Sequence, residues 1–382
     1  MSERLRRWRM VLGGAEDATG VELSGVDARR DSTLDSLYGA DADRRGGLGG
    51  SSPRVARWLG DIRGYFPGSV VQVMQRDAMD RLGLRQLLLE PELLESVQPD
   101  VHLVGTLLSL NKAIPERSRE TARAVVRKVV GELEKRLAQP TRQAVTGALH
   151  RANRTSRPRP SDIDWNRTIL ANLRHYQPEH RTVVPERLVG YGRRLPQVSR
   201  RIVLCLDQSG SMASSVVYAS VFAAVLASVR SLRTQVIAFD TAVADLTESV
   251  SDPVELLFGV QLGGGTDINA ALAYCQGRIE APRDTVLVLI SDLFEGGDEQ
   301  EMLQRAAALK ADGVQVVCLL ALDDEGAPSY DHDNAVALAE LGIPAFACTP
   351  DRFPDLMAAA IGRQDLAGWA AAHDIPVAAP GD

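Results

Sequence analysis

The sequence predicts an α/β protein: a doubly wound, mostly parallel sheet in the C-terminal part, preceded by an all-helical N-terminal domain. Two observations lead to this fold class. From residue 201 onwards, short apolar, β-rich runs alternate with helical stretches, as in parallel sheets covered by helices on both faces. Between residues 52 and 150, apolar residues recur at three- and four-residue steps without a strand-like alternation, which favours helices alone.

The chain is long enough for two domains and connecting segments. Of its 382 residues, 45% are hydrophobic and 24% are charged, as in ordinary soluble globular proteins. We expect five parts: an N-terminal segment that is partly flexible (1–50), a helical domain (51–150), an arginine-rich connector (151–200), the α/β domain (201–365) and a tail (366–382) that is disordered or loosely packed from Ala371 onwards.

The helices of the N-terminal half follow from their apolar stripes. Ser2 is a suitable N-cap for a first helix that ends near Leu12. Further helical patterns begin at Ser52, at Val70 and at Val101. The clearest stripe runs from Ala122 to Leu137, and we expect Pro140 to end that helix.

The alternation of the C-terminal half assigns its elements in order. The predicted strands are Ile202–Leu206, Gln235–Phe239, Val243–Leu246, Thr285–Ile290, Val314–Leu322 and Ala345–Ala347, with the second and third forming a hairpin. The predicted helices are Ser214–Arg230, Pro253–Phe258, one starting at Asp267, Glu299–Ala311, Asn334–Leu341 and Phe353–Ile361. Such a sheet binds ligands where its strands end.

Charge is spread unevenly along the chain. Residues 151–201 hold twelve arginines, no lysine and four acidic residues, a balance of +8 within a total of −7. We expect little regular structure in this segment beyond a short helix near Trp165–Leu173. Arginines in such a segment pair with acids of the same protein, dock a partner, or bind nucleic-acid phosphates, and the acidic flanking domains favour the first two roles.

Cysteine usage and hydropathy indicate a cytoplasmic protein. The four cysteines form no CxxC pair and no disulfide or zinc spacing, which fits a reducing compartment. The N-terminal apolar run is too short for a signal peptide. The longest apolar stretch, Val216–Val229, falls short of the ~20 residues that a membrane span needs, so we expect no span.

Three polar loops follow or lie between the predicted strands. The first is 207–211 (Asp-Gln-Ser-Gly-Ser), the second is 263–267 (Gly-Gly-Gly-Thr-Asp), and the third is the pair Ser291 and Asp292. Together they offer hydroxyl and carboxylate oxygens but no His or Cys. Such hard ligands suit Mg²⁺, Mn²⁺ or Ca²⁺ and argue against zinc.

The pattern resembles the metal-ion-dependent adhesion site of von Willebrand factor A (VWA) domains, which have a Rossmann-like fold. The resemblance covers residues 201 to about 362 and implies five metal ligands, namely Asp207, Ser209, Ser211, Thr266 and Asp292. It implies that the hydroxyls contact the cation directly, that the aspartates act largely through water, and that an Asp or Glu of a partner protein completes the shell. One departure is Leu293, where many relatives carry glycine.

The approach to this domain carries a second resemblance. The stretch 162–168 (Asp-Ile-Asp-Trp-Asn-Arg-Thr), followed by Arg193 and Arg194, is similar to bacterial CoxE-like and ViaA-like proteins. Those proteins have a helical N-terminal region and a C-terminal VWA domain, and they are associated with MoxR-type AAA+ ATPases. The resemblance therefore implies a non-catalytic, cation-dependent adaptor or co-chaperone that works with such an ATPase.

Two alternatives belong to other functional classes. A metal-dependent hydrolase would use the same cation, but the chain has neither a phosphate-binding G-x-x-x-x-G-K-[ST] motif nor a G-x-S-x-G elbow. A phosphatase of the haloacid-dehalogenase type would need an aspartate where Ser209 stands. Nucleic-acid binding would rest on residues 151–201 and would show a steep salt dependence. We favour protein binding over both.

Overall fold

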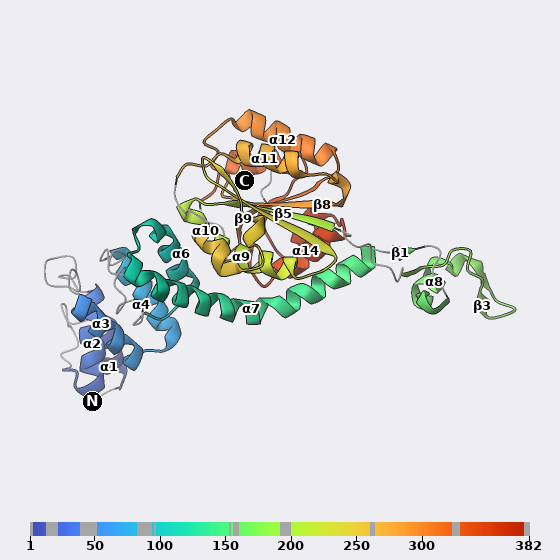
Figure 1. Cartoon of the computed structure of the whole chain (residues 1–382). Helices are drawn as coiled ribbons and strands as arrows, with labels where there is room; N and C mark the ends of the chain where they lie inside the picture. Colours follow the sequence, from blue (N-terminus) through green and yellow to red (C-terminus); the bar gives the residue numbers. More distant parts are fainter. Residues whose placement is uncertain are drawn as a thin grey trace. The chain divides into compact units, whose positions relative to one another are not determined.

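The computed structural model describes residues 3–12, 22–38, 52–81, 94, 97–152, 154–155, 160–191, 200–259, 264–322 and 329–377 (Figure 1). Contacts divide the chain into two compact units, Met1–Val129 and Val130–Asp382. The boundary falls inside one long helix. Ser2, the predicted cap of the first helix, and Gly263 lie outside the described residues.

Every regular element described in the first unit is a helix, as the sequence predicts. Their cores are the predicted apolar stripes; Val55, Ile62, Leu107 and Val126, for example, are all buried. The indole of Trp58 donates a hydrogen bond to the carbonyl of Thr33 at 3.0 Å. The helices are α1 (Glu3–Leu12), α2 (Gly25–Tyr38), α3 (Ser52–Tyr65), α4 (Gly68–Arg81), α6 (Val101–Ser109) and the first part of α7 (Glu116–Ala152).

The prediction that Pro140 ends its helix is wrong, because α7 continues to Ala152. Pro140 lies on the exposed side of the helix, where water can bind the carbonyl that its missing N–H leaves unpaired. On the opposite side the buried stripe continues past the proline through Thr141, Val145 and Leu149. Burial of these side chains outweighs the cost of the proline, which is about 3 kcal/mol.

The connector is more structured than predicted. It holds the expected short helix, α8 (Trp165–Ala171), but also two pairs of short strands. Strand β1 (Arg154–Thr155) pairs with β4 (Gly190–Tyr191), and β2 (Tyr176–Gln177) pairs with β3 (Thr182–Val183), both antiparallel. Strands of two residues carry no periodicity, so the sequence pattern does not reveal them.

The α/β domain is built on one six-stranded sheet in the order β10-β9-β8-β5-β6-β7. All neighbours are parallel except the edge strand β7, which forms the predicted hairpin with β6. Strand β8 is buried throughout and β5 is buried from Ile202 onwards, as expected of a sheet covered on both faces. The strands are β5 (Arg200–Asp207), β6 (Leu232–Phe239), β7 (Val243–Asp245), β8 (Thr285–Ile290), β9 (Gln315–Leu322) and β10 (Ala345–Cys348).

Helices cover both faces of this sheet, which confirms the doubly wound prediction (Figure 1). One face carries α11 (Ile268–Arg278), α12 (Glu299–Ala311) and α13 (His332–Glu340), and the other carries α9 (Ala213–Ala227), α10 (Pro253–Gly259) and α14 (Phe353–Ile361). An aspartate side chain caps the start of each helix on the first face, namely Asp267, Asp298 and Asp331. Acidic caps suit the positive end of a helix dipole.

Helix α9 is apolar because it is enclosed. Together with the turn before it, the stretch Gly210–Ala227 is long and apolar enough to cross a membrane by composition, and it is the one such stretch in the part of the chain that is described. Its side chains from Ser215 to Leu226 are buried against the sheet and neighbouring helices. Packing inside the domain therefore accounts for its composition.

The predicted tail begins with a short helix whose apolar side chains pack against the α/β domain. In α15 (Leu366–Ala372), Leu366, Trp369 and Ala370 are buried. The ring of Trp369 lies 6.1 Å from that of Phe346 on β10, measured between centroids. Residues 378–382 of the predicted tail lie outside the described part.

Candidate metal centre

The candidate site lies where the central strands end. From β5 the chain continues to β6 on one side of the sheet and later to β8 on the other, so β5 and β8 are neighbours at the point where the strand order reverses. Leu206 pairs with Ile290, which places Ser291 and Asp292 beside the end of β5. Open α/β sheets bind ligands at such a switch point.

Asp207 is the buried base of the site. It is the last residue of β5 and is only 1% exposed. One carboxylate oxygen accepts a hydrogen bond from the backbone N–H of Ser209 at 2.8 Å. The other accepts one from the hydroxyl of Ser291 at 2.7 Å. These bonds join the first loop to the third.

The hydroxyls of the first loop extend the network towards the surface. The oxygens of Ser209 and Ser211 are 3.1 Å apart. Ser211 donates to a carboxylate oxygen of Asp292 at 2.6 Å, and Asp292 is 4% exposed. Four of the five predicted ligands are thus brought together, with two aspartates below and two serines nearer to solvent.

The third loop is held in a strained conformation. Leu293 has a φ of 66°, in the left-handed region that favours glycine. Its side chain is fully buried, its N–H donates to the hydroxyl of Ser291 at 3.0 Å, and its carbonyl accepts from the amide of Asn334 at 3.1 Å. Next to it, the carbonyl of Asp292 accepts from the N–H of Asp331 at 2.9 Å. A leucine therefore occupies the glycine-like position without displacing Asp292.

Thr266, the fifth predicted ligand, lies on the second loop beside the third. Its carbonyl accepts from the N–H of Gly296 at 2.8 Å, and the N–H of the next residue, Asp267, donates to the carbonyl of Asp240 at 2.8 Å. These contacts hold Thr266 between the loops that follow β6 and β8. They come from the backbone, and the threonine side chain is half-buried.

The electrostatics of the site fit a divalent cation. Burial raises the pKa of Asp207 and the charge of Asp292 raises it further, while hydrogen bonds from Ser291 and Ser209 oppose the rise. Two carboxylates of low exposure whose charges act on each other are a costly arrangement without a positive charge. Among the residues that the structure describes, no three or more His, Cys, Asp or Glu side chains are placed so that they alone could hold a metal ion. Two acids with hydroxyls suit Mg²⁺, Mn²⁺ or Ca²⁺ rather than zinc.

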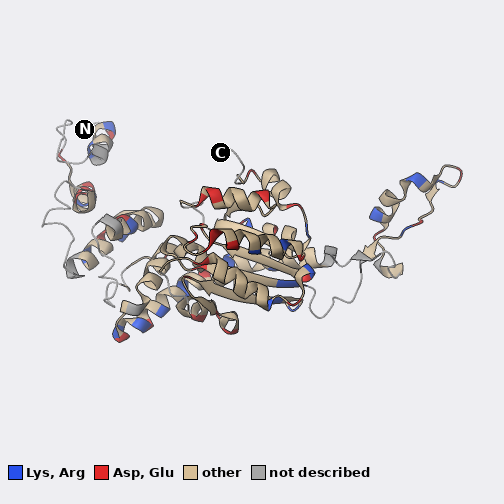
Figure 2. Cartoon of the chain, turned by 90° about the horizontal axis from the view of Figure 1, so that it is seen from above, with Lys and Arg blue, Asp and Glu red and all other residues tan. Residues whose placement is uncertain are grey.

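An acidic rim surrounds the site. Residues 202–382 contain 26 acidic and 8 basic residues. Figure 2 shows the acidic residues gathering towards one end of the α/β domain and basic residues towards the other. We call the acids on the loops and helix starts at the carboxyl ends of the strands the acidic rim: Asp240, Asp267, Glu295, Asp298 and Asp331. Burial raises the pKa of Glu295 most, with Asp267 adding to the effect.

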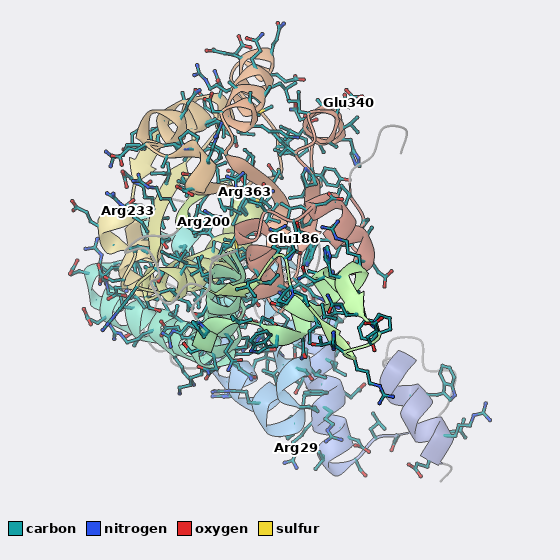
Figure 3. All side chains as sticks on the ribbon, turned by 90° about the vertical axis from the view of Figure 1, so that its right-hand side faces the viewer. Arg29, Glu186, Arg200, Arg233, Glu340 and Arg363 are labelled. Carbon is teal, nitrogen blue, oxygen red and sulfur yellow. The ribbon has the colours of Figure 1, made fainter. Side chains whose placement is uncertain are left out.

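The opposite end of the sheet is basic. Arg200 lies at the start of β5 and Arg233 near the start of β6, and both are labelled in Figure 3 with Arg363. Arg200 bonds to the carboxylate of Asp284 at 2.7 Å. Burial lowers the pKa of Arg363, and the nearby charge of Arg200 lowers it further. The domain is therefore electrically polarised along its strands.

Several residues organise the site in ways that were not predicted from the sequence. Ser291 bridges two loops, Asn334 holds the strained backbone, and Glu295 accepts the N–H of Ile268 at the start of α11. Ser291 was predicted to belong to the third loop, but its bond to Asp207 was not. The role of Asn334 could not be predicted, since it lies some forty residues further on in an unremarkable helix.

This fold and loop set define the class as a VWA-type domain. The chain matches the family model described as "VWA domain containing CoxE-like protein" over residues 134–357. It is 36% identical over 365 residues to the uncharacterized protein YehP of Escherichia coli (strain K12), covering 94% of this chain and 96% of that protein. The chain belongs to the CoxE-like VWA family.

Two solved structures are similar to the α/β part. An aerotolerance-related membrane protein from Bacteroides fragilis is 15% identical, with a TM-score of 0.36, and the match covers 43% of this chain and 100% of that one. BatB from Bacteroides thetaiotaomicron is also 15% identical, with a TM-score of 0.33 and coverage of 43% and 98%.

Proposed function

We propose that the chain is a non-catalytic adaptor that binds a protein through one divalent cation held by Asp207, Ser209, Ser211, Thr266 and Asp292. The observation that supports this most is the bonded cluster of Ser209, Ser211 and Asp292 over the buried Asp207. Oxygens from separate loops lie within hydrogen-bonding distance of one another at the surface end of a rigid sheet.

The hydroxyl and carboxylate residues would have different roles in holding a cation. The hydroxyls of Ser209, Ser211 and Thr266 are neutral ligands, so they leave its charge poorly neutralised. Asp207 and Asp292 supply negative charge from below, and Ser291 and Asn334 keep the loops in place. When bound, Mg²⁺ supplies an unfilled coordination position for a carboxylate of the partner.

The acidic rim makes such binding strictly dependent on the cation. A carboxylate that approaches Asp240, Asp267 and Glu295 is repelled, because like charges at short range disfavour contact. The bound cation would supply the attraction that offsets this repulsion for an acidic side chain. We therefore expect a chelator to abolish partner binding rather than to weaken it.

We infer that the partner machinery is a MoxR-type AAA+ ATPase. Support comes from membership in the CoxE-like family, whose resemblance implies this association, and from the lack of a phosphate-binding motif in the chain. The four described cysteines are all buried and free, which fits a role in the cytoplasm. The adaptor would deliver or recognise clients for the motor.

The two alternatives gain less support. The hydroxyls of Ser211 and Ser291 donate to aspartates, and within the described ranges no histidine is bonded to either, so a nucleophile–base pair is missing there. Among the arginines of 151–201, Arg174 and Arg201 pair with Glu186 and Glu280. Such pairs favour the intramolecular role over phosphate binding.

Calorimetric titration of the full chain with Mg²⁺ and Mn²⁺ tests the site. The wild-type chain should bind one cation. Ser211→Ala should weaken binding at least tenfold, because it removes one direct ligand. Ser214→Ala is the matched control, since Ser214 lies one helical turn further on, outside the cluster, and should bind like wild type.

A pull-down with and without chelator tests the adaptor role. An AAA+ ATPase or another protein should be recovered by wild type only when Mg²⁺ is present, and not by Ser211→Ala. If the chain binds the cation but recovers no protein in a Mg²⁺-dependent way, the metal site is supported and the adaptor role is refuted. Absence of cation binding would refute the metal site itself.

A further inference from the structure

Helix α8, which Figure 1 places in the connector, has exposed apolar residues on one side and buried polar residues on the side that bonds to residues 186–189. Trp165, Ile169 and Leu173 recur at four-residue steps and are 55%, 42% and 54% exposed. Thr168 and Asn172, on the other side, are 1% and 2% exposed. This is the reverse of an ordinary surface helix, in which the apolar stripe faces the core.

The reversed orientation is fixed by hydrogen bonds. The amide nitrogen of Asn172 donates to the carbonyls of Thr168 and Arg187, and its oxygen accepts from the N–H groups of Glu186 and Arg187 at 3.0 and 3.2 Å. The hydroxyl of Thr168 bonds to both backbone groups of Val189. Because five of these bonds join α8 to residues 186–189, rotating the helix would break all five. The apolar side therefore has to face outwards.

The exposed apolar side of α8 extends into the residues directly after the helix. Its members, which we call the α8 face, are Trp165, Ile169, Leu170, Leu173 and Tyr176, and each is at least 42% exposed. In the described part of the α/β domain, Phe294 is the one large apolar residue with comparable exposure. Exposed apolar groups gathered in this way mark a contact surface, whereas scattered ones do not.

The charges around the α8 face indicate what covers it. Asp164 caps the start of the helix, with Arg167 at 3.7 Å from its carboxylate. Arg174, between Leu173 and Tyr176 at the other end of the face, pairs with Glu186 at 3.0 Å, as does His175. The border thus carries both signs, each near a neutralising partner. A polyanion or a uniformly acidic protein would find few unpaired arginines there.

A border of mixed charge fits a second copy of the same surface. An antiparallel contact related by a two-fold axis places the start of one α8 against the end of the other, so that Asp164 of one copy meets Arg174 of its partner. We propose that the α8 face binds the α8 face of a second copy and makes the chain a dimer. The inference does not depend on the cation site.

Sedimentation velocity of the full chain across micromolar concentrations tests this dimer. Wild type should dimerise, and both Ile169→Asp and Leu173→Asp should raise the dimer dissociation constant at least tenfold, because each places a charge in the apolar contact. Val73→Asp is the matched control: Val73 is 52% exposed on a helix of the other unit and should leave the dimer intact. Circular dichroism spectra should be the same for all three variants.

Disulfide trapping gives a second, independent readout. Since the four native cysteines are buried, an introduced surface thiol is the reactive one. Ile169→Cys should form a covalent dimer on mild oxidation, and Val73→Cys should not. A wild-type chain that is monomeric at every concentration, or a dimer that survives both aspartate substitutions, overturns the proposal.

Discussion

The backbone of Leu293 connects the strain of one residue with the order of the candidate site. A non-glycine residue at a φ of 66° costs roughly 1–2 kcal/mol. The full burial of its side chain and the bond from Asn334 hold it there. Asp292 is therefore fixed before any ligand arrives, since its own carbonyl is also bonded to the N–H of Asp331.

Asn334→Ala should weaken Mg²⁺ binding by about tenfold, because outer partners of metal ligands are commonly worth 10–100-fold in affinity. The measurement is the calorimetric titration used for the serine variants. Asn269→Ala is a suitable control, since the Asn269 amide bonds to Glu301 on α12, away from Asp292. Equal affinity of Asn334→Ala and wild type would show that the loop holds its shape unaided.

The cysteines should be unreactive in the native protein. Burial raises the pKa of Cys318 and of Cys348 to about 12. At pH 8 only about one thiol in ten thousand is then a thiolate, and the thiolate is the nucleophile. Labelling with iodoacetamide should be negligible in native protein and complete for all four cysteines in guanidinium. Rapid native labelling of either residue would contradict the buried positions.

Among the elements, α7 shows what a propensity rule misses. A proline is a reliable helix breaker only when nothing else holds the chain in a helix. Here the apolar stripe continues at the same spacing on both sides of Pro140, and the proline faces solvent. Extending the stripe beyond the proline would have predicted the helix correctly.

Pro140→Ala should stabilise the chain by about 1–3 kcal/mol, because it restores a backbone hydrogen bond and removes a steric conflict in the helix interior. Urea unfolding followed by circular dichroism measures the change. Gln139→Ala, at the adjacent exposed position, should change stability by a few tenths of a kcal/mol at most. Lower stability of Pro140→Ala would mean that the packing of α7 requires the proline's local geometry.

The elements that the sequence predicts best are those with the clearest apolar pattern. Strand β8 and helices α12 and α14 have the predicted bounds, since continuous apolar runs and clear stripes specify them. The connector was predicted poorly because its folding relies on one buried asparagine, Asn172, and not on apolar periodicity. In the site, the ends of the predicted strands were enough to locate the loops that carry the ligands. The supporting role of Asn334 could not be predicted, because it depends on a tertiary contact with Leu293.

At the scale of the whole molecule, the polarised charge of the α/β domain should govern cation binding. The acidic rim raises the local concentration of cations, and salt screens this attraction. Mg²⁺ affinity should therefore fall as the NaCl concentration rises, and Asp240→Asn should reduce this salt dependence. Glu340→Gln, which changes an acid at the far end of α13, is the control. A salt-independent affinity would indicate that the rim does not act at the site.

Part of the negative charge of the acidic rim comes from the aspartates that cap α11, α12 and α13. Asp267, Asp298 and Asp331 each accept a backbone N–H that a helix start would otherwise leave without a partner, and losing such a cap costs about 1 kcal/mol. Because these helices begin where the parallel strands finish, the caps gather on a single edge. Replacing these three aspartates by residues that cannot cap would loosen three helices at once, so the same side chains that hold the helix starts also give this edge its negative charge.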